Sequence, residues 1–204
     1  MATTSNNLPC PELENYLVGD ECGENFAGLG EVIYAFERKK LVAGALSRSG
    51  ETYKLTKATP FKPDGYLYKF ECKRESQQIQ GEGQGDNAGY RITLNMVIKA
   101  VNKKTARILR TIQNRDLCYI IPDGDEYQIL YDKNKKVYTE SGDITTDTGA
   151  AAGDDRQSNV TVKLGPVAFP NMFLDISEVT VSGGGTFDLE SLLYEEETSE
   201  EDGE

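Results

Sequence analysis

One stretch decides the fold: YRITLNMVIKAVNKKTARILRTIQNRDLCYIIPDGDEYQILYD, residues 90–132. Its first part, residues 90–101, alternates between polar and apolar side chains, which predicts a long β-strand. The apolar side chains are Ile92, Leu94, Met96 and Ile98. A helix over residues 102–115 follows, because Asn102 is a good N-cap and apolar residues then recur at helical spacing. Those residues are Ala106, Leu109 and Ile112, with Ile108 beside them. The segments LCYII and YQILY then predict a hairpin around the turn at 122–126.

The sequence on either side of this stretch adds further strands of the same character. The segment 66–80 has the clearest period of two, with Tyr66, Tyr68, Phe70 and Cys72 alternating with Leu67, Lys69, Glu71 and Lys73, and it predicts one long strand. The other expected strands are 31–38, 52–58, 135–141, 159–169 and 172–181. We therefore expect one mainly β domain over residues 31–181, with seven to nine strands and one flanking helix. An irregular N-terminal arm (1–30) and a flexible acidic C-terminal tail (182–204) complete the chain.

Charge is unevenly distributed along the chain. The net charge is −12, but residues 1–37 hold seven acidic residues and residues 188–204 hold nine, and neither segment has a basic residue. The 18 remaining acidic residues face all 22 lysines and arginines, so the body is mildly basic. No run approaches the roughly 20 apolar residues of a membrane-spanning helix, and the N-terminus lacks the pattern of a secretory signal. We expect a soluble protein, made in a cytosol, that does not bind membranes.

Several kinds of chemistry are excluded or made improbable by composition. The chain has no histidine, which removes serine–histidine and cysteine–histidine hydrolases and every imidazole-ligated metal centre. Its four cysteines form no CxxC pair. Cys72 and Cys118 lie in expected strands and are interpreted as packed thiols, whereas Cys10 and Cys22 would pair only under oxidising conditions. We therefore expect no enzyme activity, cofactor or metal, although chemistry based on carboxylates is left open.

Two glycine-rich segments resemble ligand loops without meeting their requirements. In GEGQGDNAG (81–89), Asp86 stands where a dinucleotide loop needs its third glycine, and a strand follows where a helix is required. We interpret this segment as a hairpin tip. The segment 141–164 contains Asp143, Asp147, Asp154 and Asp155, but their spacing is not that of a calcium loop, so we interpret them as turn formers.

The order of these features resembles the tail tube proteins of long-tailed bacteriophages and related contractile injection machines. The resemblance is carried by a long strand and loop (ESQQIQGEGQGDNAGYRITLNMVIKA), a helix ending in LRTIQNRDL, and the hairpin CYIIPDGDEYQILYD. The threonine- and glycine-rich segment VYTESGDITTDTGAAAGDDRQSNVTVKL and the ending PVAFPNMFLD follow in the order of that family. Near the start, CGENFAGLGEVIYAFERKKL and TYKLTKA are also similar.

The resemblance implies a β-sandwich or half-barrel that closes into a ring by oligomerisation, in hexameric or dodecameric rings that stack into a tube. The implied role is a structural virion protein of a phage tail, made in the host cytoplasm. Its implied partners are copies of itself, other tail or connector proteins, and double-stranded DNA passing through the lumen. A ring or adaptor protein of a short-tailed phage with the same fold is an alternative.

Three sets of residues are candidates for function. On the strand 66–80, the polar side chains of one side are expected to face a channel: Lys69, Glu71, Lys73 and Glu75. Two loops are expected to contact other subunits, through Lys62, Asp64, Gly81, Gly83, Gly85 and Asp86. The helix presents a basic face: Lys103, Lys104, Arg107 and Arg110. This last face supports an alternative from another class, a nucleic-acid-binding β-domain that uses the helix over 103–115.

Overall fold

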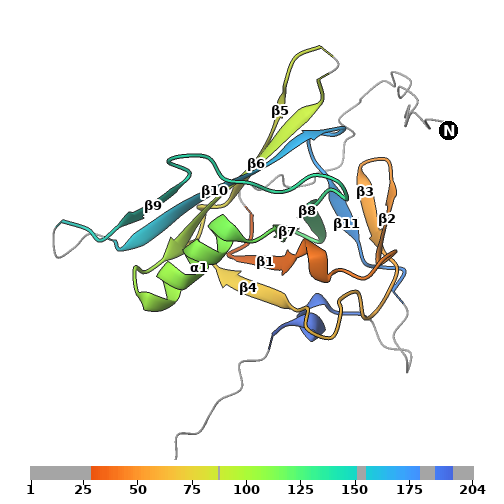
Figure 1. The fold of residues 1–204 in the computed structure, drawn as a ribbon, viewed down its shortest axis with the longest axis horizontal. Helices are drawn as coiled ribbons and strands as arrows, with labels where there is room; N and C mark the ends of the chain where they lie inside the picture. The colour runs from red at the N-terminus through yellow and green to blue at the C-terminus, as the bar shows by residue number, and fades with distance from the viewer. Residues whose placement is uncertain (1–28, 87, 151–154, 180–186, 195–204) are drawn as a thin grey trace, which may run out of the picture.

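Two β-sheets and one α-helix make up the described part of the chain (Figure 1). The structure, a computed structural model, describes residues 29–86, 88–150, 155–179 and 187–194. The first sheet has seven strands in the order β2-β3-β11-β8-β7-β1-β4, and the second has four in the order β5-β6-β10-β9. The expected mainly β fold with one flanking helix is confirmed, and neither sheet is closed on itself.

The seven-stranded sheet is built from segments distant in sequence. All its neighbouring strands are antiparallel except β3 and β11, which run parallel. Its strands are β1 (Val32–Glu37), β2 (Leu46–Ser49), β3 (Thr52–Leu55), β4 (Leu67–Glu71), β7 (Leu117–Asp123), β8 (Glu126–Leu130) and β11 (Phe173–Asp175).

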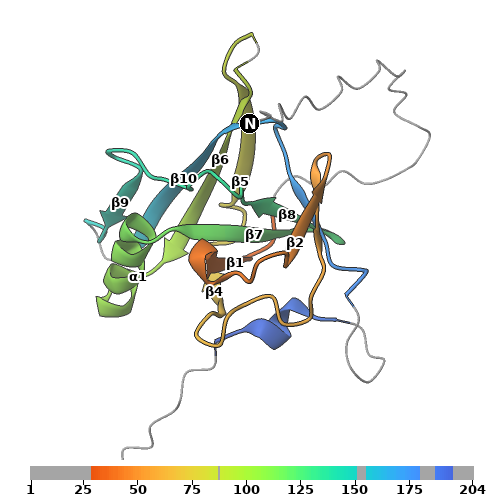
Figure 2. The same cartoon turned by 45° about the vertical axis from the view of Figure 1, so that its right-hand side comes forward.

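The four-stranded sheet is antiparallel throughout. Its strands are β5 (Gln78–Gly83), β6 (Tyr90–Lys99), β9 (Ile144–Asp147) and β10 (Gln157–Val167). The hairpin β5–β6 projects beyond the body of the molecule (Figure 1). The strands of the two sheets cross at a steep angle (Figure 2), as in orthogonally packed sandwiches.

The main core lies between the facing sides of the two sheets. From the four-stranded sheet, Leu94 of β6 and Val162 of β10 are paired neighbours and both are buried. From the seven-stranded sheet, Ala35 and Tyr119 are paired neighbours and also buried. The alternation that predicted the strand 90–101 therefore places its apolar half in this core.

The helix α1 (Lys103–Asn114) begins as the sequence predicts. The Asn102 side chain accepts a hydrogen bond from the Thr105 backbone N–H at 2.9 Å, which satisfies one of the unpaired amides of the first turn. Leu109 and Ile112 are buried, but Ala106 is exposed and Thr105 takes its place on the buried face. The prediction that Ala106 lies on the buried face is therefore wrong by one position. Thr105, whose backbone N–H is bonded to the Asn102 cap, packs inward instead.

A C-terminal segment covers the second face of the seven-stranded sheet. The short helix η2 (Leu189–Leu192) lies beneath β4 in Figure 2. Leu189 is buried and, with Leu192, borders a small apolar void shared with Ile120 and Ile129 of the sheet. The sequence assigned residues 187–194 to a flexible tail, but they form a packed part of the domain. The remaining residues of the expected tail, and most of the expected N-terminal arm, lie outside the described residues.

Several strand boundaries differ from the prediction. The segment 66–80 is two strands and not one, because the chain turns at 74–76 and passes from the first sheet to the second. Cys72 makes an isolated bridge to Ile98 of β6 at this crossing. The polar–apolar alternation continues on both sides of the turn, which is why the sequence alone reads as one strand.

Other segments differ in length. The expected strand 135–141 contributes only a bridge from Tyr138 to Lys163. Within the described part of the expected strand 172–181, the strand is β11, which ends where the Asp175 carboxylate accepts hydrogen bonds from Ser177. Strand β7 runs through Pro122, so the expected five-residue turn shrinks to Gly124 and Asp125. The strands β2 and β9 were not predicted, since both are short and polar.

Candidate functional site

The outward side of the four-stranded sheet forms a broad polar surface, which we call the polar face. It opposes the core, since neighbouring side chains of a strand point to opposite sides. Eight of its fourteen side chains are amides or hydroxyls, and five are charged. Its side chains are Gln78, Gln80 and Glu82 of β5, Arg91, Thr93, Asn95, Val97 and Lys99 of β6, Thr145 and Asp147 of β9, and Gln157, Asn159, Thr161 and Lys163 of β10.

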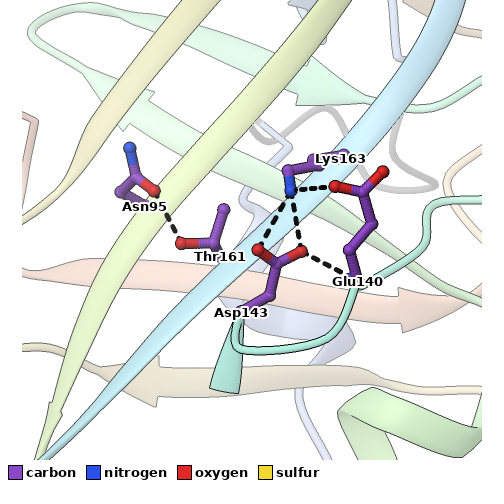
Figure 3. Close-up of polar contacts among 5 residues, drawn as sticks. All are labelled: Asn95, Glu140, Asp143, Thr161 and Lys163. Carbon is purple, nitrogen blue, oxygen red and sulfur yellow. Dashed lines mark hydrogen bonds and ion pairs between the residues drawn. The ribbon is translucent and has the colours of Figure 1, made fainter. Parts of the chain in front are cut away.

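One cation of the polar face is neutralised where it stands. The Lys163 ammonium group lies 2.6 Å from a Glu140 carboxylate oxygen and 3.0 Å from both carboxylate oxygens of Asp143 (Figure 3). These hydrogen bonds raise the pKa of Lys163. Asp143 also accepts a hydrogen bond from the Glu140 backbone N–H at 2.6 Å, so the turn that carries the two carboxylates is fixed. The interpretation of Asp143 as a turn former is confirmed.

Neighbouring polar side chains are held by hydrogen bonds across the strands. The Thr161 hydroxyl donates to the Asn95 side-chain oxygen at 2.8 Å (Figure 3). On the other side of β10, the Asn159 amide donates to the Thr145 hydroxyl at 3.3 Å. Cross-strand polar pairs of this kind stabilise a sheet surface and limit the freedom of its side chains. The polar face is therefore an ordered surface.

The β9 edge of this sheet has backbone groups that no described residue pairs. The Thr161 N–H donates to the Asp143 carbonyl, so the backbone groups of Asp143 point toward β10. The direction of the backbone groups alternates along a strand, so those of Thr145 also point toward β10. The N–H and C=O groups of Ile144 and Thr146 therefore point away from the sheet.

The β5 edge likewise has backbone groups that no described residue pairs. The Lys73 N–H donates to the Val97 carbonyl of β6. The backbone N–H and C=O groups of the odd-numbered β6 residues therefore point toward β5. The partners of those residues in β5 are Gln78, Gln80 and Glu82. By alternation, the backbone groups of Ile79, Gly81 and Gly83 point outward. Neither edge strand contains proline.

The four residues expected to face a channel are not aligned on one strand. Lys69 and Glu71 lie on β4, where the Lys69 amine pairs with Glu190 at 3.0 Å. Lys73 lies at the crossing between the sheets and pairs with Asp155 at 2.6 Å, and Glu75 occupies the turn that follows, with φ of 57°. The break at this turn separates them from the polar face.

The residues expected to contact other subunits lie in two places. Lys62 and Asp64 belong to a turn that folds back on the same chain: the Lys62 amine donates to the Lys39 carbonyl at 2.8 Å, and Asp64 pairs with Lys40, which lowers the pKa of Asp64.

The other four lie in the β5–β6 hairpin. Gly81 and Gly83 are in β5, and Gly85 and Asp86 are in the turn beyond it. A side chain at Gly81 would collide with the Pro170 backbone, so the absence of a Cβ is required by the packing of the chain itself.

The basic residues of α1 lie away from the polar face. Lys103, Lys104, Arg107 and Arg110 are all exposed. The groove between α1 and the sheet is lined by Ile144 and Ser158, which belong to the core side. The helix thus lies on the opposite side of the sheet from the polar face.

The described residues contain no cluster of three or more potential metal ligands. Burial raises the pKa of the Cys72 and Cys118 thiols, so both are packed apolar groups and poor nucleophiles, as the sequence indicates. No helix within the described ranges is long and apolar enough to span a membrane.

Comparison with protein families, with characterised proteins and with solved structures found no match to this chain.

Sequence reasoning missed the polar face, although its signal was present. The alternation in 90–101 predicts a buried side from its apolar residues, and the same pattern places Arg91, Thr93 and Asn95 together on the other side. What the sequence could not show is that β5, β6, β9 and β10 lie side by side, which is decided by pairing between distant segments.

Proposed function

We propose that this chain is a ring-forming structural subunit of a bacteriophage tail, and that the polar face lines the channel through which DNA passes. The observation that carries the proposal is the four-stranded sheet, which has one apolar face buried in the core, one polar face that no described residue covers, and edges at β5 and β9 that no described residue pairs. Open edges of this kind promote pairing with another chain, and closure into a barrel removes them.

The strand order favours closure by rotation. Because four strands alternate in direction from β5 to β9, the two edge strands run antiparallel to each other. In a ring of identical copies, β9 of one copy would therefore meet β5 of the next in antiparallel orientation. The outward groups of Ile144 and Thr146 would pair with those of Ile79, Gly81 and Gly83. This gives Gly81 and Gly83 the intersubunit role expected from the sequence, through their backbone.

The size of the barrel favours six copies. Six sheets would supply roughly 24 strands, and at a spacing of about 4.8 Å and a tilt of about 40° the barrel would be about 50 Å across between backbones. Duplex DNA fits through such a lumen with room for side chains. Twelve copies would give about twice that diameter, which is far more than a duplex needs.

The chemistry of the polar face suits a channel for DNA. Lysines and arginines that contact phosphates hold a duplex by releasing counterions. On the polar face, Lys163 is neutralised by Glu140 and Asp143. The two other cations, Arg91 and Lys99, are equal in number to the anions Glu82 and Asp147, and the amide and hydroxyl side chains carry no charge. The exposed cations of α1 lie on the opposite side, outside the proposed channel.

The test is ring formation and its dependence on the β9 edge. Purified protein at increasing concentration should form rings in negative-stain electron microscopy, with a matching mass in analytical ultracentrifugation. Thr146→Pro removes one outward N–H without touching the β9–β10 ladder, so it should abolish rings and leave the monomer folded. Thr146→Ala keeps that N–H and should still form rings.

Monomers at every concentration tested would overturn the proposal. So would rings that survive in Thr146→Pro. Salt-sensitive retention of DNA by the monomer, lost on neutralising Arg107 and Arg110, would instead favour the nucleic-acid-binding alternative.

A further inference from the structure

Five basic side chains lie together at one end of the seven-stranded sheet. A depression of about 410 Å³ lies between the end of β1 and the end of α1 and is lined by Arg38, Lys39, Arg115 and Lys136. A second depression of about 380 Å³ shares Arg38 and Lys39 and adds Lys133. We call these five cations the basic cluster.

Two of the five cations are already paired. Arg38 bonds Asp116 at 2.7 Å and donates to the Lys133 carbonyl at 3.0 Å, which joins the two depressions. Arg115 pairs with Glu37. These two carboxylates are the acidic residues that line the first depression.

The other three cations have no carboxylate within ion-pair distance among the described residues: Lys39, Lys133 and Lys136. The C-terminal dipole of α1 favours a cation such as Arg115 nearby, but it accounts for none of these three lysines, which come from other segments. The basic cluster therefore has an excess of positive charge that nothing described in the fold neutralises.

The described chain ends close to this cluster. The Tyr194 N–H donates to the Leu67 carbonyl at 2.9 Å, and Leu67 is paired with Phe36, next to Glu37 in β1. Tyr194 also contacts Tyr68, with ring centroids 5.9 Å apart. Burial raises the pKa of the Tyr68 hydroxyl, and the nearby charge of Glu37 raises it further. Arg115 is also close enough to act on this hydroxyl and opposes the rise. Tyr194 therefore lies about two strand spacings, roughly 10 Å, from the first depression.

The residues that follow have the complementary charge. Residues 195–204, EEETSEEDGE, contain seven acidic residues and no basic one. Ten residues can span up to about 33 Å when extended, which is more than the distance to the basic cluster. A tethered segment also acts at an effective concentration in the millimolar range, so even weak ion pairs would be occupied.

We propose that residues 195–204 bind the basic cluster of the same chain, with their carboxylates on Lys39, Lys133 and Lys136. The acidic segment then shields the basic cluster from nucleic acid, and the negative charge of the segment matches the positive charge of the cluster. This inference does not depend on ring formation.

The first test is zero-length cross-linking with a carbodiimide, which joins a carboxylate to an amine in direct contact. It is done on the full chain at a concentration where ultracentrifugation shows monomers. Mass spectrometry should find residues 195–204 linked to Lys39, Lys133 or Lys136. Cross-links that go mainly to Lys103 or Lys104, or that join two chains, would overturn the proposal.

The second test uses duplex DNA as a competing polyanion, followed by fluorescence anisotropy. A chain ending at Tyr194 should bind DNA more tightly than the full chain. If three lysines contact phosphates, that binding should weaken about 40-fold between 50 and 200 mM salt. The triple variant Lys39→Gln, Lys133→Gln, Lys136→Gln should remove the gain.

A matched triple variant on the helix, Lys103→Gln, Arg107→Gln, Arg110→Gln, should preserve the gain in DNA binding. All six positions are on the surface, so circular dichroism should show both variants folded. Equal DNA binding by the full and shortened chains would contradict the proposal, and so would loss of the gain only in the helix variant.

Discussion

The two sheets of this protein differ in how far the chain itself completes them. The seven-stranded sheet is covered on one side by the other sheet and on the other by residues 187–194, and its β4 edge is bridged by Leu193. The four-stranded sheet has one covered face, and both of its edges are open among the described residues. The difference teaches that the first sheet serves the stability of the monomer, while the second keeps one polar face and two edges outside the packing of the described residues.

The largest difference in the free energy of unfolding should be found between substitutions on the buried side and on the polar side of β6. Leu94→Ala, at a fully buried position between the sheets, should reduce the free energy of unfolding by about 2–5 kcal/mol. Thr93→Ala, one residue away on the polar face, should change it by less than about 0.5 kcal/mol. Urea denaturation of both variants measures the difference. Equal losses would show that the polar face is a buried part of the monomer.

The next largest effect on the free energy of unfolding should come from residues 187–194, which pack on the seven-stranded sheet. Leu189→Ala should cost about 2–3 kcal/mol, because Leu189 is buried beside Ile120 and Ile129. Leu189→Met conserves volume and should cost less than about 1.5 kcal/mol. Thermal or urea unfolding gives both values. If Leu189→Ala unfolds like the unmodified protein, residues 187–194 contribute nothing to the sheet and the contrast between the sheets is lost.

A smaller effect is expected from the ion pairs on the polar face. In a double-mutant cycle, Lys163→Met and Asp143→Asn should show a coupling of about 1 kcal/mol, since both side chains are largely shielded from water. The raised pKa of Lys163 means that this contribution is complete below the ordinary lysine pKa and is lost as pH rises through the raised value. A coupling measured at pH 7 that persisted unchanged after full titration of the lysine would contradict the assignment.

The smallest effect concerns the pH dependence of the C-terminal cover. Hydrogen bonds from Lys69 and Tyr34 lower the pKa of Glu190. The stabilisation is therefore present above the ordinary glutamate pKa and is lost as pH falls through the lowered value. The stability difference between the unmodified protein and Glu190→Gln should shrink between pH 6 and pH 3. A difference that is constant over this range would show that Glu190 makes no such pairs in solution.

Local patterns were sufficient for the elements with a clear period. The strand 90–101 and the cap at Asn102 depend on neighbouring residues alone, and both are confirmed. The segment 66–80 could not be divided from the sequence, since Cys72 continues the alternation up to the point where the chain changes sheet. The polar face was missed because it is assembled from four strands whose order depends on contacts between residues far apart in the chain.

The sequence by itself determined the class of the fold, the helix, the hairpin of β7 and β8, and the concentration of acidic residues at the two ends. These follow from periodicity and from charge, which are properties of short segments. Only the tertiary structure decided that β5 and β9 are the edge strands of their sheet, that Lys163 is neutralised, and that Lys39, Lys133 and Lys136 lie together near Tyr194. Such groupings arise because burial of apolar surface brings distant segments together, and the polar side chains are carried with them.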